Sequence, residues 1–294
     1  MRSATIKRWL GLSPALLVIG LFMVVPILIV IVYSFLAKDP YGGVEPQFST
    51  EAYKQLLFER DFDDTLLFST VNLKIFWRSV WLALLSTLLS LVAALPVAYY
   101  IARQPESRKN TLVLLVTIPF WTNLLIRTYC WILILRDTGL INGLLQRIHL
   151  IDSPITLLYT NGAVLLGLVY SYLPFMVLPL YASMEKLDMK LLEAAHDLYA
   201  NRWRVFRRVS LPLALPGIIA GCILVFIPAL GAFITPQLLG GGKNLMLGSL
   251  IQMQFGASRN WPFGAAMSLV LLSFVLIALL IYARSPAQRD GNLI

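Results

Sequence analysis

Six long apolar runs, separated by polar stretches, set the pattern of this sequence. They cover residues 10–36, 80–101, 111–135, 163–184, 214–234 and 263–283. A helix of about 20 apolar residues crosses the hydrocarbon core of a bilayer, whereas strands of a membrane barrel are shorter and alternate between apolar and polar residues. The pattern therefore predicts an all-α polytopic membrane protein with six transmembrane helices, in a single domain over residues 1–294.

Prolines interrupt most of these runs. Each removes a backbone donor and tends to kink its helix, which is tolerated at membrane depth where neighbouring helices or a wet cavity satisfy the freed carbonyls. Kinks favour a transporter over a simple anchor, although ordinary packing explains them as well. The prolines concerned are Pro14, Pro26, Pro96, Pro119, Pro174, Pro179, Pro216 and Pro228.

The composition supports a membrane protein and gives no sign of metal or redox chemistry. Of 294 residues 58% are hydrophobic and only 13% are charged, with a mean hydropathy of +0.75, which leaves too few solvating groups for a soluble protein. Cys130 and Cys222 lie inside apolar runs, and His149 and His196 are isolated. We therefore expect no disulfide framework and no metal site.

The net charge of +9 carries information about topology rather than about nucleic acid. Six spans place both termini on one side; that side holds 14 basic residues, and the longer connections on the other side hold 9. Because cytoplasmic connections are enriched in Lys and Arg, both termini are predicted to be cytoplasmic.

Arg2, Lys7 and Arg8 resemble the start of a signal peptide. The run after them is too long and lacks a cleavage pattern, so we expect an uncleaved helix.

The first external connection, residues 37–74, is acidic. We interpret it as a partly structured, solvated cap over the helix ends, in which the spacing of Tyr53, Leu56, Leu57 and Phe58 is sufficient for a short surface helix. Its acidic residues are Asp39, Glu45, Glu51, Glu59, Asp61, Asp63 and Asp64.

The predicted spans offer no catalytic constellation, because they contain no Asp, Glu or His. The run at 239–244 looks superficially like a phosphate-binding loop, but it lacks the first glycine and the Ser or Thr after Lys243. We therefore predict that this chain is not an enzyme, binds no cofactor and does not hydrolyse nucleotide itself.

The cytoplasmic segment 185–212 combines strong charge with helical periodicity. Asp188 is placed to cap a first amphipathic helix, and Asn201 precedes a second short piece. Periodicity alone is equally consistent with an interfacial hairpin that only stabilises the bundle. The recurring apolar positions are Met189, Leu192, Ala195, Leu198 and Tyr199 in the first helix, and Trp203, Phe206 and Val209 in the second.

Within this segment Glu193-Ala194-Ala195, Asp197-Leu198 and Leu211-Pro212 resemble the EAA motif of transmembrane subunits of ABC importers. The resemblance implies the type I importer permease fold and a hairpin that docks into a separate ATPase subunit. Small alanines allow a close approach to a groove, and charged groups fix the orientation. The coupling residues it implies are Glu193, Ala194, Ala195, Asp197, Leu198, Tyr199 and Asn201.

One position departs from the family pattern, because Tyr199 stands where glycine is usual. A left-handed conformation costs a tyrosine roughly 1 to 2 kcal/mol. We therefore expect the turn to be made differently, with Asn201 taking over.

Residues 118–127, 173–181 and 260–266 resemble permeases of spermidine/putrescine importers, though relatives that carry other solutes share parts of them. The resemblance implies a subunit in the bacterial inner membrane. Its implied partners are a second homologous permease, two copies of an ABC ATPase that holds ATP and magnesium, and a periplasmic polyamine-binding protein.

A polyamine path in this subunit would have to use aromatic faces and carbonyl dipoles, because its helices offer no carboxylates. The candidates near the proline kinks are Trp121, Asn123, Tyr129, Tyr170 and Tyr172. Arg127 lies within an apolar run. It is explained either by an external vestibule, where it pairs with a partner protein, or by a structural role with snorkelling or internal pairing; we favour the structural role.

Three rival functions stay open from the residues. The first is an ABC permease for another small solute, such as an anion or a metal complex. The second is an ion-coupled secondary transporter, which would need titratable groups in the membrane that the spans do not supply. The third is a membrane-embedded enzyme, for which no catalytic cluster is visible.

Overall fold

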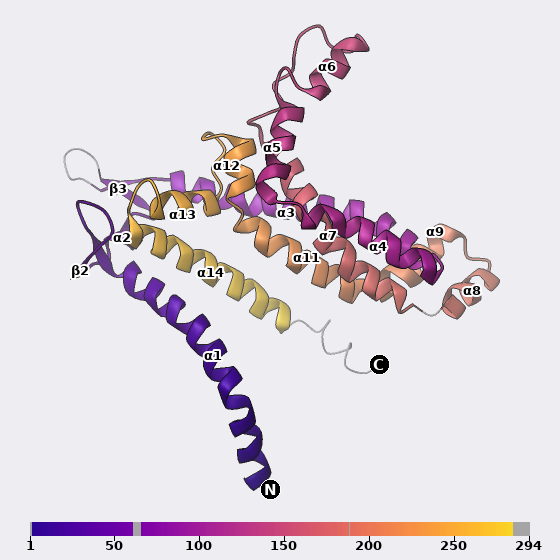
Figure 1. Ribbon diagram of the computed structural model, residues 1–294, viewed down its shortest axis with the longest axis horizontal. Coiled ribbons are helices and arrows are strands. Elements are labelled where there is room, and N and C mark those ends of the chain that lie inside the picture. Colours follow the sequence, from indigo (N-terminus) through magenta and orange to yellow (C-terminus); the bar gives the residue numbers. More distant parts are fainter. Residues whose placement is uncertain (1, 61–65, 188, 285–294) are drawn as a thin grey trace. The chain divides into compact units, whose positions relative to one another are not determined.

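The computed structural model describes residues 2–60, 66–187 and 189–284 (Figure 1). The chain divides into two compact units, one formed by Met1–Leu73 with Leu250–Ile294 and the other by Lys74–Ser249. Helices dominate both units, so the predicted all-α class is confirmed.

The first unit pairs the N-terminal helix α1 (Arg2–Ser34) with α14 (Trp261–Ala283), together with the end of α13 (Leu247–Phe255). The rings of Tyr33 and Trp261 stack with centroids 6.1 Å apart, and the Ser34 and Tyr53 hydroxyls lie 2.9 Å apart. From Leu16 to Val32 nearly all large apolar side chains of α1 are exposed, as expected for a helix that faces lipid or another subunit.

The acidic connection folds into two small antiparallel hairpins on either side of a one-turn helix. The hairpins are β1 (Leu36–Lys38) with β2 (Val44–Phe48), and β3 (Phe58–Arg60) with β4 (Leu66–Phe68), and the helix is α2 (Glu51–Lys54). The predicted surface helix is thus present but ends at Lys54, and Phe58 belongs to a strand, where its ring meets that of Phe68 edge-on. Asp61, Asp63 and Asp64 lie outside the described residues.

The second unit is a helical bundle built on α3 (Val71–Ala102), α4 (Glu106–Trp121), α7 (Asn161–Glu185) and α11 (Leu215–Leu230) (Figure 1). Helix α5 (Leu124–Leu135) and the short α6 (Leu140–Arg147) follow α4, and α12 (Ile234–Gly240) follows α11. Between α7 and α11 lie α8 (Met189–Asp197), α9 (Arg202–Val205), a π-helix η1 (Phe206–Ser210) and α10 (Leu211–Leu213).

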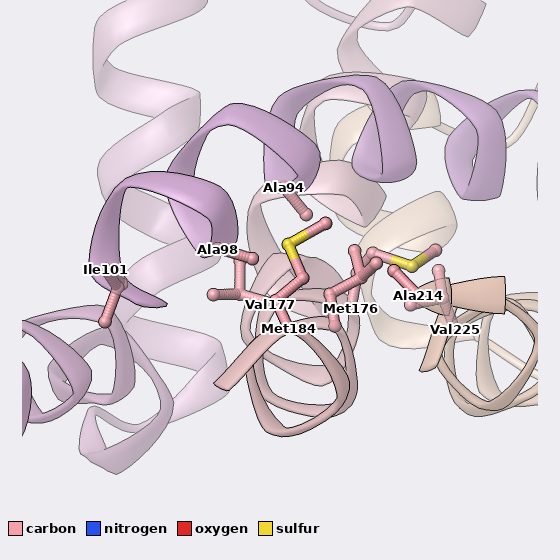
Figure 2. Packing of buried hydrophobic residues seen from close by; sticks show 9 residues of the cluster. Ala94, Ala98, Ile101, Met176, Val177, Met184, Ala214 and Val225 are labelled. Atoms are coloured by element: carbon pink, nitrogen blue, oxygen red, sulfur yellow. The ribbon is translucent and has the colours of Figure 1, made fainter. Parts of the chain in front are cut away.

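The core of this bundle forms where α3 and α11 meet α7. Ala94 and Ala98 point from α3 towards Met176 and Val177 of α7, as Figure 2 shows. Gly217 and Gly221 of α11 lie so close to α7 that an added Cβ at Gly217 would come within 2.5 Å of the Pro179 carbonyl oxygen. Small residues therefore set the close helix spacing, as is usual in membrane bundles.

Four helices in the described part of the chain are long and apolar enough to span a membrane, and two bent pairs bring the number to six if each is one span. The predicted run 111–135 is one of these pairs: α4 and the segment from Leu124 to Arg147 meet at 86°. The break lies at Thr122 and Asn123, where the Asn123 side chain caps α5 by accepting from the amide of Leu125 at 2.8 Å. The Thr122 hydroxyl donates a hydrogen bond to the Pro119 carbonyl oxygen at 2.7 Å.

Three other boundaries differ from the predicted ones. Helix α3 begins at Val71, because Lys74 and Arg78 interrupt the apolar pattern without interrupting the helix. Helix α11 ends at Leu230, and Leu36 belongs to β1 rather than to the first span. Helices α1, α3 and α7 continue through their prolines.

Candidate coupling hairpin and transport path

The hairpin between α7 and α11 is anchored at its root by an ion pair. The Glu185 Oε1 atom, at the end of α7, accepts from the Tyr181 hydroxyl at 2.5 Å and lies 3.2 Å from Lys109 Nζ of α4. This pair ties α4 to α7 where the hairpin begins. In the sequence, Lys109 was counted only as a basic residue that indicates the cytoplasmic side, so its ion pair with Glu185 was not predicted.

Helix α8 exposes the residues of the motif. Glu193, Ala194 and Asp197 are exposed and Ala195 is half-buried. Leu198 and Tyr199 are 82% and 95% exposed, so they contribute no buried face within this chain. The cap predicted at Asp188 and the side chains of Met189 and Leu192 lie outside what the structure describes.

The turn after α8 is made by Tyr199 itself, so the prediction that Asn201 takes over the left-handed position is wrong. Tyr199 has φ +58°, and the Ala200 amide donates to the Ala195 carbonyl at 3.2 Å. This is the Schellman arrangement, in which glycine normally holds the left-handed position. Asn201 is extended and caps α9, its side chain accepting from the Arg204 amide at 2.8 Å. The predicted capping role of Asn201 is thus confirmed.

The second piece of the hairpin is packed differently from the predicted amphipathic helix. Val205 is the buried residue, at 1% exposure, whereas Trp203 is 67% exposed and stacks on Phe206 at 5.7 Å. The segment Phe206–Ser210 is a π-helix. Trp203 and Phe206, which were predicted to lie on one side with Val209, contact each other, and the wider π-helical turn changes the α-helical spacing only from Phe206 to Val209.

Arg127 is buried without a hydrogen-bonding partner for two of its nitrogens. Its side chain is only 9% exposed, and its Nε and Nη1 atoms meet no acceptor among the described residues. The guanidinium carbon lies 5.8 Å from the ring centre of Tyr170. The predicted structural role of Arg127, snorkelling or internal pairing, stays a prediction, because its guanidinium contacts the Tyr170 ring while two of its nitrogens have no acceptor among the described residues.

The five residues predicted for the substrate path do not form one cluster. Trp121 and Tyr129 are 81% and 55% exposed, and Asn123 caps α5. Tyr170 meets Trp131 edge-on at 5.5 Å, while the Tyr172 hydroxyl donates to the Pro228 carbonyl at 3.1 Å. In the described part of the chain, no hydrogen bond or ring contact joins any two of the five.

A polar clamp at the beginnings of α3 and α7 explains the glycine-rich run 239–244. Arg78 donates to the side-chain oxygens of Asn161 and Asn244 and to the Lys243 carbonyl. The Asn244 amide in turn donates to the Tyr159 carbonyl at 2.8 Å. The run is thus a structural loop held by an arginine. An arginine near the start of a predicted span was the available signal.

Comparison with known proteins adds a family and a fold. Residues 83–287 match the family described as binding-protein-dependent transport system inner membrane component. The spermidine/putrescine transport system permease protein PotB of Salmonella typhimurium (strain SL1344) is 44% identical, with 90% of this chain and 88% of that protein covered. PotB of Escherichia coli (strain K12) is 43% identical, with 90% and 92% covered.

A solved structure shares the fold. It is a bacterial alginate ABC transporter in complex with an alginate pentasaccharide-bound periplasmic protein, and one of its chains superposes with a TM-score of 0.67. The two chains are 19% identical, with 95% of this chain and 94% of the other covered. The type I importer permease fold implied by the motif is thereby confirmed.

Proposed function

Because this chain belongs to the family of inner membrane components of binding-protein-dependent transport systems, we propose that it moves polyamines of the spermidine and putrescine class across the inner membrane as one permease of an ABC importer. The observation that carries the proposal is the similarity to spermidine/putrescine permeases over 90% of the chain. Permeases for other small solutes are the alternative that the test below addresses.

The chain works within a larger assembly under this proposal. A second, homologous permease completes the pathway, and a periplasmic protein delivers the polyamine. Two copies of a cytoplasmic ATPase hold ATP and magnesium and carry out the hydrolysis, so this chain needs no cofactor or catalytic site. Both termini lie in the cytoplasm, which agrees with the excess of basic residues on that side.

The hairpin 185–212 couples the ATPase to the bundle. Glu193, Ala194 and Asp197 are available on α8 for docking, and the apolar side chains of Leu198 and Tyr199 extend beyond them. The root of the hairpin is joined to α4 through Lys109 and to α3 through the edge-on contact of Phe206 with Tyr99, 5.3 Å between centroids. A displacement of α8 therefore reaches three spans as a rigid-body movement.

The path for a polycation runs through neutral groups in this subunit. Trp121, Asn123, Tyr129, Tyr170 and Tyr172 are the candidates, and cation–π contacts of roughly 0.5 to 2 kcal/mol each are weak enough to allow release. The carboxylates that a polyamine requires are then supplied by the second permease and the periplasmic protein.

Uptake measurements in cells that lack this chain test the proposal. The wild-type chain should restore energy-dependent accumulation of labelled spermidine or putrescine. Glu193→Trp should lower accumulation at least tenfold at equal protein level, since the bulky side chain obstructs docking. Asp152→Trp, a matched change at an exposed acidic residue outside the hairpin, should have no effect. Restoration of uptake of a small anion in place of polyamines would assign the chain to another solute.

A further inference from the structure

The arginine-rich end of the hairpin lies beside the end of α3. Phe206 packs edge-on against Tyr99, which is three residues from the end of α3 at Ala102. Val205 and Ser210 are fully buried on either side of this contact. The segment from Arg204 to Arg208 is therefore held against the bundle near the end of α3, which we place at the depth of the lipid headgroups.

Three arginines and a tryptophan form a cleft at this position. Asn201, Trp203, Arg204, Arg207 and Arg208 line a concavity of about 510 Å³, and we call it the arginine cleft. All five side chains are exposed. Within the described ranges of the chain, none of the three guanidinium groups is paired with a carboxylate. The cleft thus combines three guanidinium groups with an aromatic ring.

We propose that the arginine cleft binds the phosphate headgroup of an anionic phospholipid of the cytoplasmic leaflet. A guanidinium donates two parallel hydrogen bonds to phosphate oxygens, which a single point charge does not do. Tryptophan is enriched at headgroup level, where one part of the ring contacts acyl chain and the indole N–H contacts water or headgroup. Juxtamembrane clusters of basic residues attract anionic lipids by about 1 kcal/mol per charge.

An acidic surface of the ATPase is the other class of partner, and the structure favours lipid. The motif that marks the docking surface lies on α8, where Leu198 and Tyr199 are 82% and 95% exposed. The arginine cleft begins after the turn at Tyr199, on elements whose buried residues Val205 and Ser210 face the bundle. The two surfaces belong to different helices, so one can hold lipid while the other holds protein.

Lipid retention by the purified full-length chain tests the proposal. The chain is exchanged into detergent containing equal amounts of phosphatidylglycerol and phosphatidylcholine, and the bound lipid is measured by native mass spectrometry. The wild type should retain phosphatidylglycerol selectively. The triple variant R204Q/R207Q/R208Q should bind it on the order of 100-fold more weakly, and each single variant about fivefold more weakly. Lysine at the same three positions should recover part of the affinity for phosphatidylglycerol. Lysine restores the positive charge but lacks the planar guanidinium that makes two parallel hydrogen bonds to a phosphate.

Two controls distinguish lipid binding by the arginine cleft from a non-specific effect of positive charge and from a role of the cleft in ATPase docking. K38Q/K54Q/K243Q removes the same charge from the connections on the opposite side and should leave retention unchanged. Equal phosphatidylglycerol binding by the wild type and R204Q/R207Q/R208Q would overturn the proposal. So would a triple variant that keeps its lipid while the assembled importer loses its ATPase, since that outcome assigns the cleft to protein. If the triple variant does not fold, the single variants decide by the same measurement.

Discussion

Arg127 is a charged side chain in a buried position that leaves two of its nitrogens without an acceptor among the described residues. A buried donor without an acceptor costs about 1 to 3 kcal/mol, and Arg127 has two such nitrogens. Its ring contact at 5.8 Å lies near the outer limit for a cation–π interaction and offsets only part of this cost. The guanidinium is thus incompletely satisfied in the isolated chain.

Replacing Arg127 by methionine should therefore raise the free energy of unfolding of the purified chain in detergent by about 1 to 3 kcal/mol. Chemical denaturation with urea or dodecyl sulfate measures the difference. Arg127→Lys serves as the matched control and should give no gain, because an ammonium group remains buried. A lower stability of Arg127→Met would show that the arginine has a stabilising partner within the chain.

Tyr199 provides the second prediction at this scale. Tyr199→Gly should stabilise the turn after α8 by about 1 kcal/mol, because glycine has no Cβ to oppose the left-handed conformation. Hydrogen exchange at the Ala200 amide, which is bonded to Ala195, should slow by about fivefold. Tyr199→Val should speed it, since a β-branched side chain is still less compatible with positive φ. Equal exchange in all three proteins would contradict the strain at Tyr199.

Single residues were predicted well where their role is local. Asn201 was expected to cap a helix, and it does so through the Arg204 amide one turn away. The left-handed conformation of Tyr199 was not predicted, because intrinsic preference disfavours tyrosine there, whereas the Ala200–Ala195 hydrogen bond that ends α8 requires it. The lack of an acceptor for two nitrogens of Arg127 depends on which helices surround α5, and no local sequence pattern predicts that.

Among the elements, the contact of α11 with α7 depends on two glycines spaced by four residues. A methyl group at Gly217 would meet the Pro179 carbonyl and the Ser183 side chain, each at 2.5 Å, and one at Gly221 would meet the Met176 sulfur at 2.6 Å. The two glycines form a small-residue seam of the kind that lets membrane helices approach closely. The backbone oxygen at Gly217 makes that position the less adaptable of the two.

Gly217→Ala should therefore lower the free energy of unfolding by about 1 to 3 kcal/mol, as overpacking does in other cores, and Gly221→Ala by less, because a methionine side chain can move. Gly143→Ala is the matched control within α6, where an added Cβ meets nothing within 4 Å. That change should be neutral or stabilising by up to about 1 kcal/mol. If Gly217→Ala left the free energy of unfolding unchanged, α11 and α7 would be able to move apart without loss of stability, which would contradict the prediction.

Element boundaries were the least predictable feature from the sequence. The run 111–135 is uniformly apolar, so composition could not reveal that Asn123 ends one helix and caps the next. A π-helix likewise has no reliable sequence signal, so the π-helical turn at Phe206–Ser210 could not be predicted from the α-helical spacing. By contrast, α14 and α7 begin and end within a few residues of the predicted runs, because apolar length and flanking polar residues specify them locally.

For the whole molecule, the proposed orientation can be tested with reporter fusions. A fluorescent protein that folds only in the cytoplasm should be bright when inserted after Arg103, and alkaline phosphatase, active only outside, should be active when inserted after Gly242. The reciprocal fusions serve as controls and should be inactive. Reversed activities would contradict the cytoplasmic placement of the termini, which follows from the 14 to 9 distribution of basic residues.

The global class was the most predictable level, since six runs of sufficient apolar length leave few alternatives to a membrane bundle. The division into two units was not predicted. It depends on contacts between distant parts of the chain, such as Tyr33 with Trp261 and Asn260 with Gln55. The expectation of one permease domain over 1–294, with 37–74 and 185–212 as its external and cytoplasmic segments, stays a prediction about the assembled importer.

The clamp at Arg78 has a consequence for tolerance to acid. Its acceptors are two asparagine amides and a backbone carbonyl, none of which gains a proton in a mildly acidic medium. At the far end of α7, the fastening between Lys109 and Glu185 depends on a carboxylate. We place the Arg78 contacts towards the periplasm, where the pH follows the surroundings of the cell, and these contacts do not depend on a titratable acceptor. We place the ion pair of Lys109 with Glu185, which is lost when the carboxylate gains a proton, towards the cytoplasm, where the pH is buffered.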